Sequence, residues 1–353
     1  MQQRSKLTAV TLSAVALAAA ACGSTSKATS STSSPASSAS STTSGGGSSA
    51  SAPLPAANVA SKHYSVVYIG GVGGNPFYTS VACGATVQAK AMGVAFSQQE
   101  PQTYDPTVQV PIVNAVVAQH PNAIMIAVDS ATALVSPLQR AQKAGIKVLT
   151  VDGVLSTPGV SITNVQSDDF AGGQLAGNTL AQEINGKGTV VAIYNKPGSS
   201  VSDARVKGFA TAIAKYPGIH YLGVQSSNNE TALAASTIQD EILSHPSLNG
   251  VFTVTTNNTE GVATGIKTAG KVGKVKIVGY DTSAPIVADI QAGEVSADIV
   301  QAPYRTGEEE IVLAVDSLEG KTVPTQVLEP FVVATPQNIN TANVQAFIYK
   351  TSC

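Results

Sequence analysis

The sequence predicts an α/β protein built from two doubly wound, mainly parallel sheets. Short apolar segments rich in Val, Ile and Tyr alternate with segments of helical spacing, and such alternation implies βαβ units. The alternation stops and then restarts in the second half of the chain. A length of 353 residues is enough for about two domains with their own cores. We therefore expect two lobes of the same class.

Residues 1–22 predict a secretion signal that ends in a lipidated cysteine. Arg4 and Lys6 precede an apolar run over residues 7–21, which is too short for a comfortable membrane span. Residues 17–23 resemble a bacterial lipobox, with Ala19 where Leu is usual. We expect cleavage before Cys22 and lipid attachment to it, and an ordinary cleaved signal is the alternative.

Residues 23–62 predict a disordered tether. They are nearly all Ser, Thr, Ala, Gly and Pro, with Lys27 and Lys62 as the charged residues. Such a segment cannot bury enough apolar surface to offset its chain entropy. Its typical end-to-end distance of about 35 Å suits a folded module held near a membrane. A mucin-like stalk is the alternative.

The first half of the folded part predicts strands over residues 64–69, 94–99, 123–127 and 147–151, with helices over 76–92, 108–118 and 133–144. The second half predicts strands over 189–193, 221–225, 250–255 and 275–280, with helices over 203–215, 230–244, 260–269 and 284–292. Asn75 caps the first helix ahead of Pro76, while Gly145 and Gly270 end later ones. The strands are nearly continuous apolar runs, as in sheets covered on both faces.

Several classes of function have no support in the sequence. A net charge of −2 gives no general attraction to nucleic acid or to an acidic membrane surface. Three Cys and four scattered His cannot form a dense metal cluster. The glycine-rich residues 70–74 have Pro76 where a dinucleotide fingerprint needs its third glycine. Because no nucleophile elbow or Cys–His pair is visible either, we expect no enzyme, no cofactor and no metal.

Polar residues recur at the carboxyl ends of the predicted strands, where open α/β sheets form their ligand crevice. Singly, each would be explained as a helix cap or a turn residue. Their recurrence in both halves of the chain favours a binding site. The residues are Asn75, Asp129, Ser130, Asp152, Asn257, Asn258, Tyr280, Asp281 and Gln301, together with Arg205 at the predicted opening of a helix.

A set of motifs appears along the chain: residues 75–78 (NPFY), 151–152 (VD), 167–169 (SDD) with 172–173 (GG), 205–209 (RVKGF), 278–281 (VGYD) and 299–301 (IVQ). In this order they resemble the signature points of the ribose-type periplasmic sugar-binding proteins, which are the solute receptors of ABC importers. The resemblance covers roughly residues 63–335 and implies a type I periplasmic binding protein with three crossovers. Its lobes would be residues 63–166 plus 302–330, and residues 167–301 plus 331–353.

The resemblance also implies roles for the site residues. Asn75 would bond a ligand hydroxyl, while Phe77 and Tyr78 would pack against the apolar faces of a sugar ring. Asp152 and Asp281 would accept from hydroxyls, and Arg205 would donate across the cleft. Asn258 (or Asn257) and Gln301 would complete the polar shell, with Asp129 and Tyr280 at neighbouring strand ends.

Two departures from the family pattern put ribose itself in doubt. Gly153 stands where ribose receptors carry a second Arg, and residues 127–130 (AVDS) lack their Asn. The calcium-loop pattern of the glucose/galactose branch is not visible. A different pentose, a hexose or a polyol fits these departures.

Cys83 in the first predicted helix and Cys353 at the end of the sequence would both face an oxidising compartment after export. We expect them to form a disulfide that ties the C-terminal tail to the first lobe, with two free thiols as the alternative.

Together these expectations describe a monomeric, extracytoplasmic receptor, anchored to the membrane only by its lipid, that delivers a small neutral sugar or polyol to an ABC permease by hinge closure. A signalling receptor of the same fold, serving a sensor kinase, is the alternative. A transcription regulator would need a helix-turn-helix where the tether lies, and an enzyme would turn over its sugar.

Overall fold

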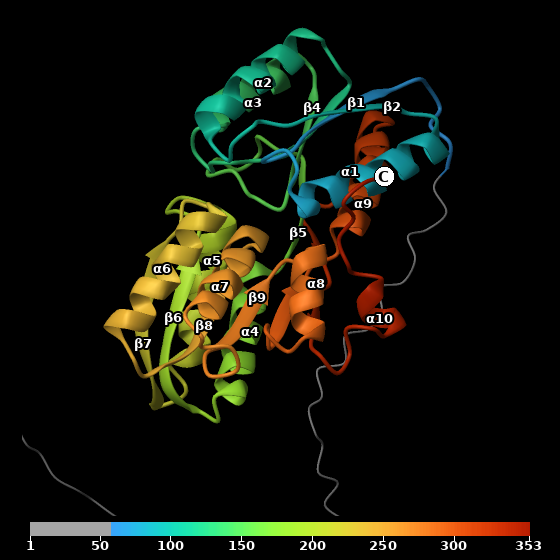
Figure 1. Cartoon of the computed structure of the whole chain (residues 1–353). Helices are drawn as coiled ribbons and strands as arrows, with labels where there is room; N and C mark the ends of the chain where they lie inside the picture. Colours follow the sequence, from blue (N-terminus) through green and yellow to red (C-terminus); the bar gives the residue numbers. More distant parts are fainter. Residues whose placement is uncertain (1–57) are drawn as a thin grey trace, which may run out of the picture. The chain divides into compact units, whose positions relative to one another are not determined.

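The computed structural model describes residues 58–353, which form two six-stranded sheets (Figure 1). The predicted signal peptide, Cys22 and most of the tether lie outside the described residues. The strand orders are β11-β5-β4-β3-β1-β2 and β12-β10-β9-β8-β6-β7. Within residues 58–353, neighbouring strands are parallel except for β10 and β12. We call the first sheet with its helices the N-lobe and the second the C-lobe.

The N-lobe has one pair of helices on each face of its sheet (Figure 1). Alternate strand residues such as Val67 and Ile124 pack with α2 and α3, while their neighbours Tyr68 and Met125 pack with α1 and α9. The elements are β1 Ser65–Ile69, α1 Pro76–Met92, β2 Ala95–Gln99, α2 Pro106–Ala118, β3 Ala123–Ala127, α3 Val135–Lys143, β4 Lys147–Val151, β5 Thr163–Ser167, α9 Pro303–Leu318 and β11 Val327–Glu329.

The C-lobe repeats this arrangement. Val190 and Phe252 pack with α4 and α5 on one face of the sheet, and Val191 and Val251 pack with α6, α7 and α8 on the other. The elements are α4 Asp169–Glu183, β6 Lys187–Tyr194, α5 Ser200–Ile213, β7 Gly218–Ser226, α6 Thr231–Ser244, β8 Leu248–Thr253, α7 Thr256–Thr268, β9 Lys276–Tyr280, α8 Ala284–Gln291, β10 Ala297–Val300, β12 Val332–Ala334 and α10 Ala342–Gln345.

Three connections join the two sheets: β5 leads into α4, β10 leads into α9, and β11 leads into β12. The predicted fold class, two doubly wound lobes with three crossovers, is confirmed. The helix ranges expected from the sequence omit α4 and α9. Both helices contain glycines, which weaken a helical pattern.

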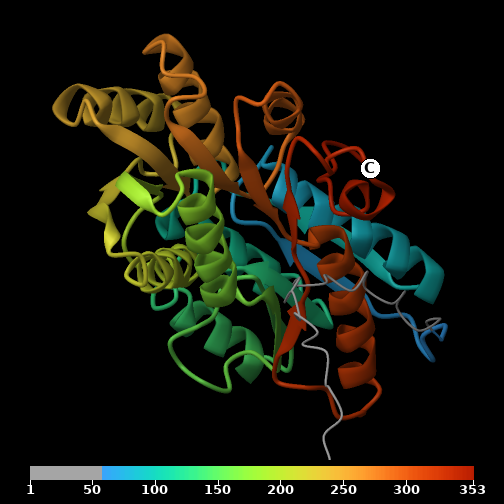
Figure 2. The ribbon, with the colours of Figure 1, turned by 90° about the horizontal axis from the view of Figure 1, so that it is seen from below.

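These glycines let helices approach closely. A Cβ at Gly173 in α4 would overlap the Arg205 carbonyl oxygen in α5, and one at Gly84 in α1 would overlap the Tyr304 carbonyl oxygen in α9. The α1 and α9 ribbons run side by side in both views (Figure 1, Figure 2). Backbone contact of this kind holds α5 and its side chains against α4 in the C-lobe.

Two predicted element boundaries are wrong in ways that affect the site. Helix α5 begins at Ser200 rather than at residue 203, so Arg205 lies inside the helix and does not open it. Strand β8 ends at Thr253 and α7 begins at Thr256, because the Thr255 side chain caps that helix by accepting from the Asn258 N–H. Asn257 and Asn258 therefore lie in the first turn of α7, not after a strand.

The end of the predicted tether belongs to the N-lobe. The Ala60 N–H donates to the Met92 carbonyl at 2.9 Å, and the Ser61 N–H donates to Glu319 Oε1 at 2.7 Å. Cys83 and Cys353 are joined by a disulfide with Cα atoms 5.2 Å apart, which is the predicted pairing. Across residues 58–353, no helix combines the length and the hydrophobicity that a membrane crossing requires.

Candidate ligand-binding site

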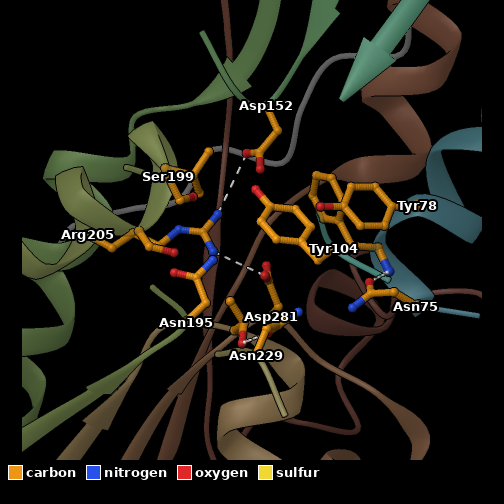
Figure 3. A pocket seen from close by; sticks show the side chains of 13 residues that line it. Asn75, Tyr78, Tyr104, Asp152, Asn195, Ser199, Arg205, Asn229 and Asp281 are labelled. Atoms are coloured by element: carbon orange, nitrogen blue, oxygen red, sulfur yellow. Dashed lines mark hydrogen bonds and ion pairs between the residues drawn. The ribbon is translucent and has the colours of Figure 1, made fainter. Parts of the chain in front are cut away.

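A pocket lies between residues of the two lobes at the carboxyl ends of both sheets (Figure 3). Its cavity volume is about 40 Å³. Its N-lobe lining is Asn75, Phe77, Tyr78, Tyr104 and Asp152, and its C-lobe lining is Asn195, Ser199, Val201, Ser202, Arg205, Asn229, Thr255 and Asp281.

Asp152 and Asp281 occupy equivalent positions in the two lobes. Each directly follows a strand, β4 or β9, and each has a left-handed backbone, with φ of 60° and 70°. Asp tolerates this conformation better than most residues, but it still costs free energy, and such positions cluster at ligand sites. The conformation turns both carboxylates toward the pocket, as Figure 3 shows.

Arg205 links the acidic residues of the pocket although only 1% of its surface is exposed. Its Nε donates to Asp169 Oδ1 at 2.8 Å, and its Nη1 donates to Asp281 Oδ2 at 3.1 Å and to the Val254 carbonyl at 2.8 Å. The guanidinium lies over the Tyr280 ring, 3.8 Å from its centroid. These contacts hold Arg205 in one orientation.

Arg205 and Asp152 form an ion pair across the lobes but no hydrogen bond (Figure 3). Arg205 Nη2 and Asp152 Oδ1 are 3.7 Å apart, too far for a hydrogen bond, and neither atom has another hydrogen-bond partner among the described residues. A hydroxyl placed beside both atoms could accept from Nη2 and donate to Oδ1. The gap thus matches one ligand hydroxyl.

Burial makes the acidic groups of the pocket reluctant to ionise. It raises the pKa of Asp152 well above its ordinary value, and the nearby Asp169 charge raises it further while Arg205 opposes the shift. Burial likewise raises the pKa of Asp169 to about 6, although Arg205 favours its ionised form. Three carboxyl groups, those of Asp152, Asp169 and Asp281, thus surround one guanidinium.

The N-lobe wall of the pocket is aromatic. Asn75 Oδ1 caps α1 by accepting from the Phe77 N–H at 2.9 Å, which leaves the Asn75 amide NH₂ as a donor. Phe77 and Tyr78 meet edge to face with ring centroids 5.4 Å apart. This wall offers apolar faces beside one directed donor.

Five residues predicted to bind ligand do not line the pocket, and three of them, Tyr280, Gln301 and Asn257, contact residues that do. Tyr280 lies under Arg205, and Gln301 Nε2 donates to Asp281 Oδ1 at 2.7 Å. The side-chain amide of Asn257 donates to the Asn229 carbonyl at 2.9 Å, and that of Asn258 to Ser227 Oγ at 2.6 Å.

Asp129 is the fifth, and it is 3% exposed. Its N–H donates to Gln109 Oε1, and Gln109 in turn donates to the carbonyls of Gly70 and Ala127. Burial raises the pKa of Asp129 to about 9, although the Lys196 charge opposes this. Both of its carboxyl oxygens are buried, and neither has a hydrogen-bond partner among the described residues.

The sequence prediction missed several pocket residues: Tyr104, Asn195, Ser199, Val201, Ser202, Asn229 and Thr255. Asn195 directly follows β6, so the strand-end signal was present, but the predicted strand stopped at residue 193. Tyr104 lies in the loop before α2 and carries no such signal. Its carbonyl accepts from Lys196 Nζ at 2.9 Å, a contact between the lobes.

Gly153 explains the missing second Arg. A Cβ there would lie 2.9 Å from Val128 Cγ2 and 3.2 Å from the Val128 carbonyl oxygen, so a side chain has no room. The Val154 N–H beside it donates to Ser200 Oγ at 3.2 Å, a second contact between the lobes. At this edge of the pocket the backbone of Gly153 and Val154 lies where ribose receptors carry an Arg side chain.

Residues 66–322 match the sequence model of the periplasmic binding protein domain. The chain belongs to the periplasmic binding protein family. Members of this family bind solutes and catalyse no reaction. The predicted resemblance is thereby confirmed.

Relatives of this periplasmic binding protein have names that refer to sugars. The D-apiose import binding protein of Paraburkholderia graminis is 25% identical over 64% of this chain and 72% of its own length. The ribose import binding protein of Escherichia coli (strain K12) is 25% identical over 70% of this chain and 83% of its own length.

Solved structures agree with the fold. An ABC transporter solute-binding protein from Agrobacterium vitis, bound with α-D-tagatopyranose, has a TM-score of 0.79 at 33% identity and covers 81% of this chain and 99% of that one. A carbohydrate transporter solute-binding protein from Agrobacterium radiobacter, in complex with D-arabinose, has a TM-score of 0.78 at 25% identity and covers 82% and 99%.

Proposed function

We propose that this periplasmic binding protein is the receptor of an ABC importer for a neutral monosaccharide or polyol. The observation that carries the proposal is the 3.7 Å gap between Arg205 Nη2 and Asp152 Oδ1, which matches a hydroxyl that accepts and donates at once. The apolar rings of Phe77 and Tyr78 on the opposite wall suit the C–H face of a sugar. The relatives named for apiose and ribose import, and the solved structures bound with tagatose and arabinose, support this class.

The charge of the pocket disfavours ionic ligands. A ligand carboxylate would meet Asp152 and Asp281, whereas a ligand ammonium would meet the buried Arg205 guanidinium. A hydroxyl-rich neutral molecule avoids both costs because each hydroxyl can turn its proton toward or away from a carboxylate. The absence of space beside Gly153 removes one cation from the site and favours a sugar other than ribose.

Ligand binding would close the hinge between the lobes. The pocket takes residues from both lobes, so a sugar gains its full set of contacts only when Asp152 and Arg205 face each other. We further propose that Cys22 is lipidated and that residues 23–57 tether the protein outside the cytoplasm, where the closed lobes dock on a permease. Labelling of Cys22 by lipid, absent from a Cys22→Ala variant, tests the anchor.

A thermal-shift panel tests the ligand class. D-ribose, D-arabinose, D-apiose, D-tagatose, ribitol and, as charged comparisons, glutamate and lysine are added to the lipid-free protein. A sugar present at a hundred times its Kd stabilises by about 2.7 kcal/mol. In a folded unit of this size that raises Tm by roughly 4 °C. A shift with glutamate or lysine alone, or with no sugar or polyol of the panel, would overturn the proposal.

A further inference from the structure

The C-terminal segment passes between the lobes a fourth time. Residues 332–345 belong to the C-lobe, where β12 pairs with β10 and Gln291 donates to Asn340 Oδ1 at 2.9 Å. Beyond residue 348 the chain contacts α1 of the N-lobe. The Lys350 N–H donates to Ser80 Oγ at 2.6 Å, and the Cys83–Cys353 disulfide fixes the end covalently.

Tyr349 lies at the point where this segment crosses, and it is 5% exposed. Its ring meets Phe77 of the N-lobe edge to face, with centroids 5.9 Å apart. Its hydroxyl donates to Asp281 Oδ1 of the C-lobe at 2.7 Å and accepts from the Gln301 N–H at 3.3 Å. One side chain therefore joins an aromatic residue of one pocket wall to a carboxylate of the other.

Asp281 is held through both of its oxygens. Oδ1 accepts from Gln301 Nε2 and from the Tyr349 hydroxyl, each at 2.7 Å, which uses both of its lone pairs. Oδ2 accepts from Arg205 Nη1 at 3.1 Å and keeps one lone pair. The three donors leave a single acceptor direction for a hydroxyl in the pocket.

We propose that Tyr349 is a positioning residue that fixes the acceptor direction of Asp281 and couples this carboxylate to the N-lobe through the disulfide-tied tail. This inference rests on the proposed sugar-binding function, whose site it deepens. Burial and the Asp281 charge raise the pKa of Tyr349 well above its ordinary value, so the hydroxyl remains a donor. When the lobes separate, Tyr349 cannot keep both its Phe77 and its Asp281 contacts.

A first experiment needs no ligand. Amide hydrogen exchange of the peptide covering residues 297–303 is compared in the wild type, Tyr349→Phe and Tyr64→Phe. Tyr64 is a matched control because it is a buried N-lobe tyrosine that does not line the pocket. Loss of the bond to the Gln301 N–H should speed its exchange about fivefold in Tyr349→Phe only. Equal exchange in all three proteins would overturn the proposal.

A second experiment measures Kd by calorimetry with D-arabinose, D-tagatose and D-ribose. Tyr349→Phe, which keeps the ring, should weaken binding about tenfold, whereas Tyr64→Phe should not. The double variant Cys83→Ser/Cys353→Ser should also bind the sugar more weakly. In that double variant, Tyr349→Phe should raise Kd by a smaller factor than it does in the wild type, because both changes release the same contact.

The outcomes separate this inference from the proposed function. Unchanged Kd in Tyr349→Phe, or fully additive losses with the cysteine changes, would overturn the role of Tyr349. If the wild type binds none of the three sugars, the sugar-receptor proposal loses its support, while the hydrogen-exchange comparison still decides whether Tyr349 holds the Asp281 region.

Discussion

Replacing Arg205 by Met should lower the free energy of unfolding of the protein, in addition to removing a ligand contact. The guanidinium makes charge-assisted bonds to Asp169 at 2.8 Å and Asp281 at 3.1 Å, and another to the Val254 carbonyl at 2.8 Å. Without it the buried carboxylates have no cation. Breaking a buried ion pair by removing one partner costs about 3–5 kcal/mol, and we expect the free energy of unfolding to fall by this amount.

Urea unfolding, followed by circular dichroism, measures the change. Arg140→Met is the control, because Arg140 lies on the exposed part of α3 and bonds only Ser136 and Asn114 there. We expect less than about 1 kcal/mol for the control. A loss of less than about 1 kcal/mol in Arg205→Met as well would refute the reasoning, because the carboxylates would then not depend on the guanidinium.

The pH dependence provides an internal check. Without the cation, the pKa values of Asp152 and Asp169 in the folded state rise further above their unfolded values, so the stability that depends on their protonation is lost as pH rises. The deficit of Arg205→Met should therefore be smallest near pH 4 and largest above pH 7. Adding Asp169→Asn, which removes one buried charge, should restore part of the loss.

Three further predictions concern the pocket and its support. Asp281→Ala should weaken sugar binding by about 2–4 kcal/mol, because it leaves Arg205 with an unused buried donor; an unchanged Kd by calorimetry would remove Asp281 from the site. Burial raises the folded pKa of Asp129 to about 9, so the wild type loses stability as pH rises from about 4 to 9. Since Asn does not titrate, the stability of Asp129→Asn relative to the wild type should increase with pH by up to about 1.4 kcal/mol per unit, and a flat difference in urea unfolding would contradict this. Gly173→Ala should cost about 1–3 kcal/mol because its Cβ meets the Arg205 backbone, whereas Gly73→Ala, with its nearest neighbour 3.5 Å away, should be neutral; equal effects would show that α4 and α5 can separate.

The sequence was most informative where the residue type and the backbone position carry the same signal. Asp152 and Asp281 were predicted as ligand residues because polar residues directly after buried strands face the crevice of an open sheet, and the structure places both in the pocket. The same rule would have found Asn195 if the end of β6 had been placed one residue later. Errors of this size are common at element ends, since fraying and capping shift them.

The rule failed where a polar side chain bonds to another group of the protein instead of facing the pocket. Asn257 and Asn258 donate hydrogen bonds to the loop after β7, and Gln301 donates one to Asp281. The choice between these roles depends on contacts from distant parts of the chain, which a local pattern does not contain. The contact of Tyr349 with Asp281 could not be predicted for the same reason, because the two residues are nearly 70 positions apart and the path of the C-terminal segment brings them together.

The backbone contact between α1 and α9 has a consequence for the order of folding. The strands β6 to β10 and the helices α4 to α8 come from one uninterrupted stretch, so most of the C-lobe can assemble as soon as that stretch emerges. The N-lobe must wait for Gly307 of α9 to reach α1, more than 200 residues later in the chain. We therefore expect an exported chain to complete its first-synthesised lobe last, after its middle portion is already native.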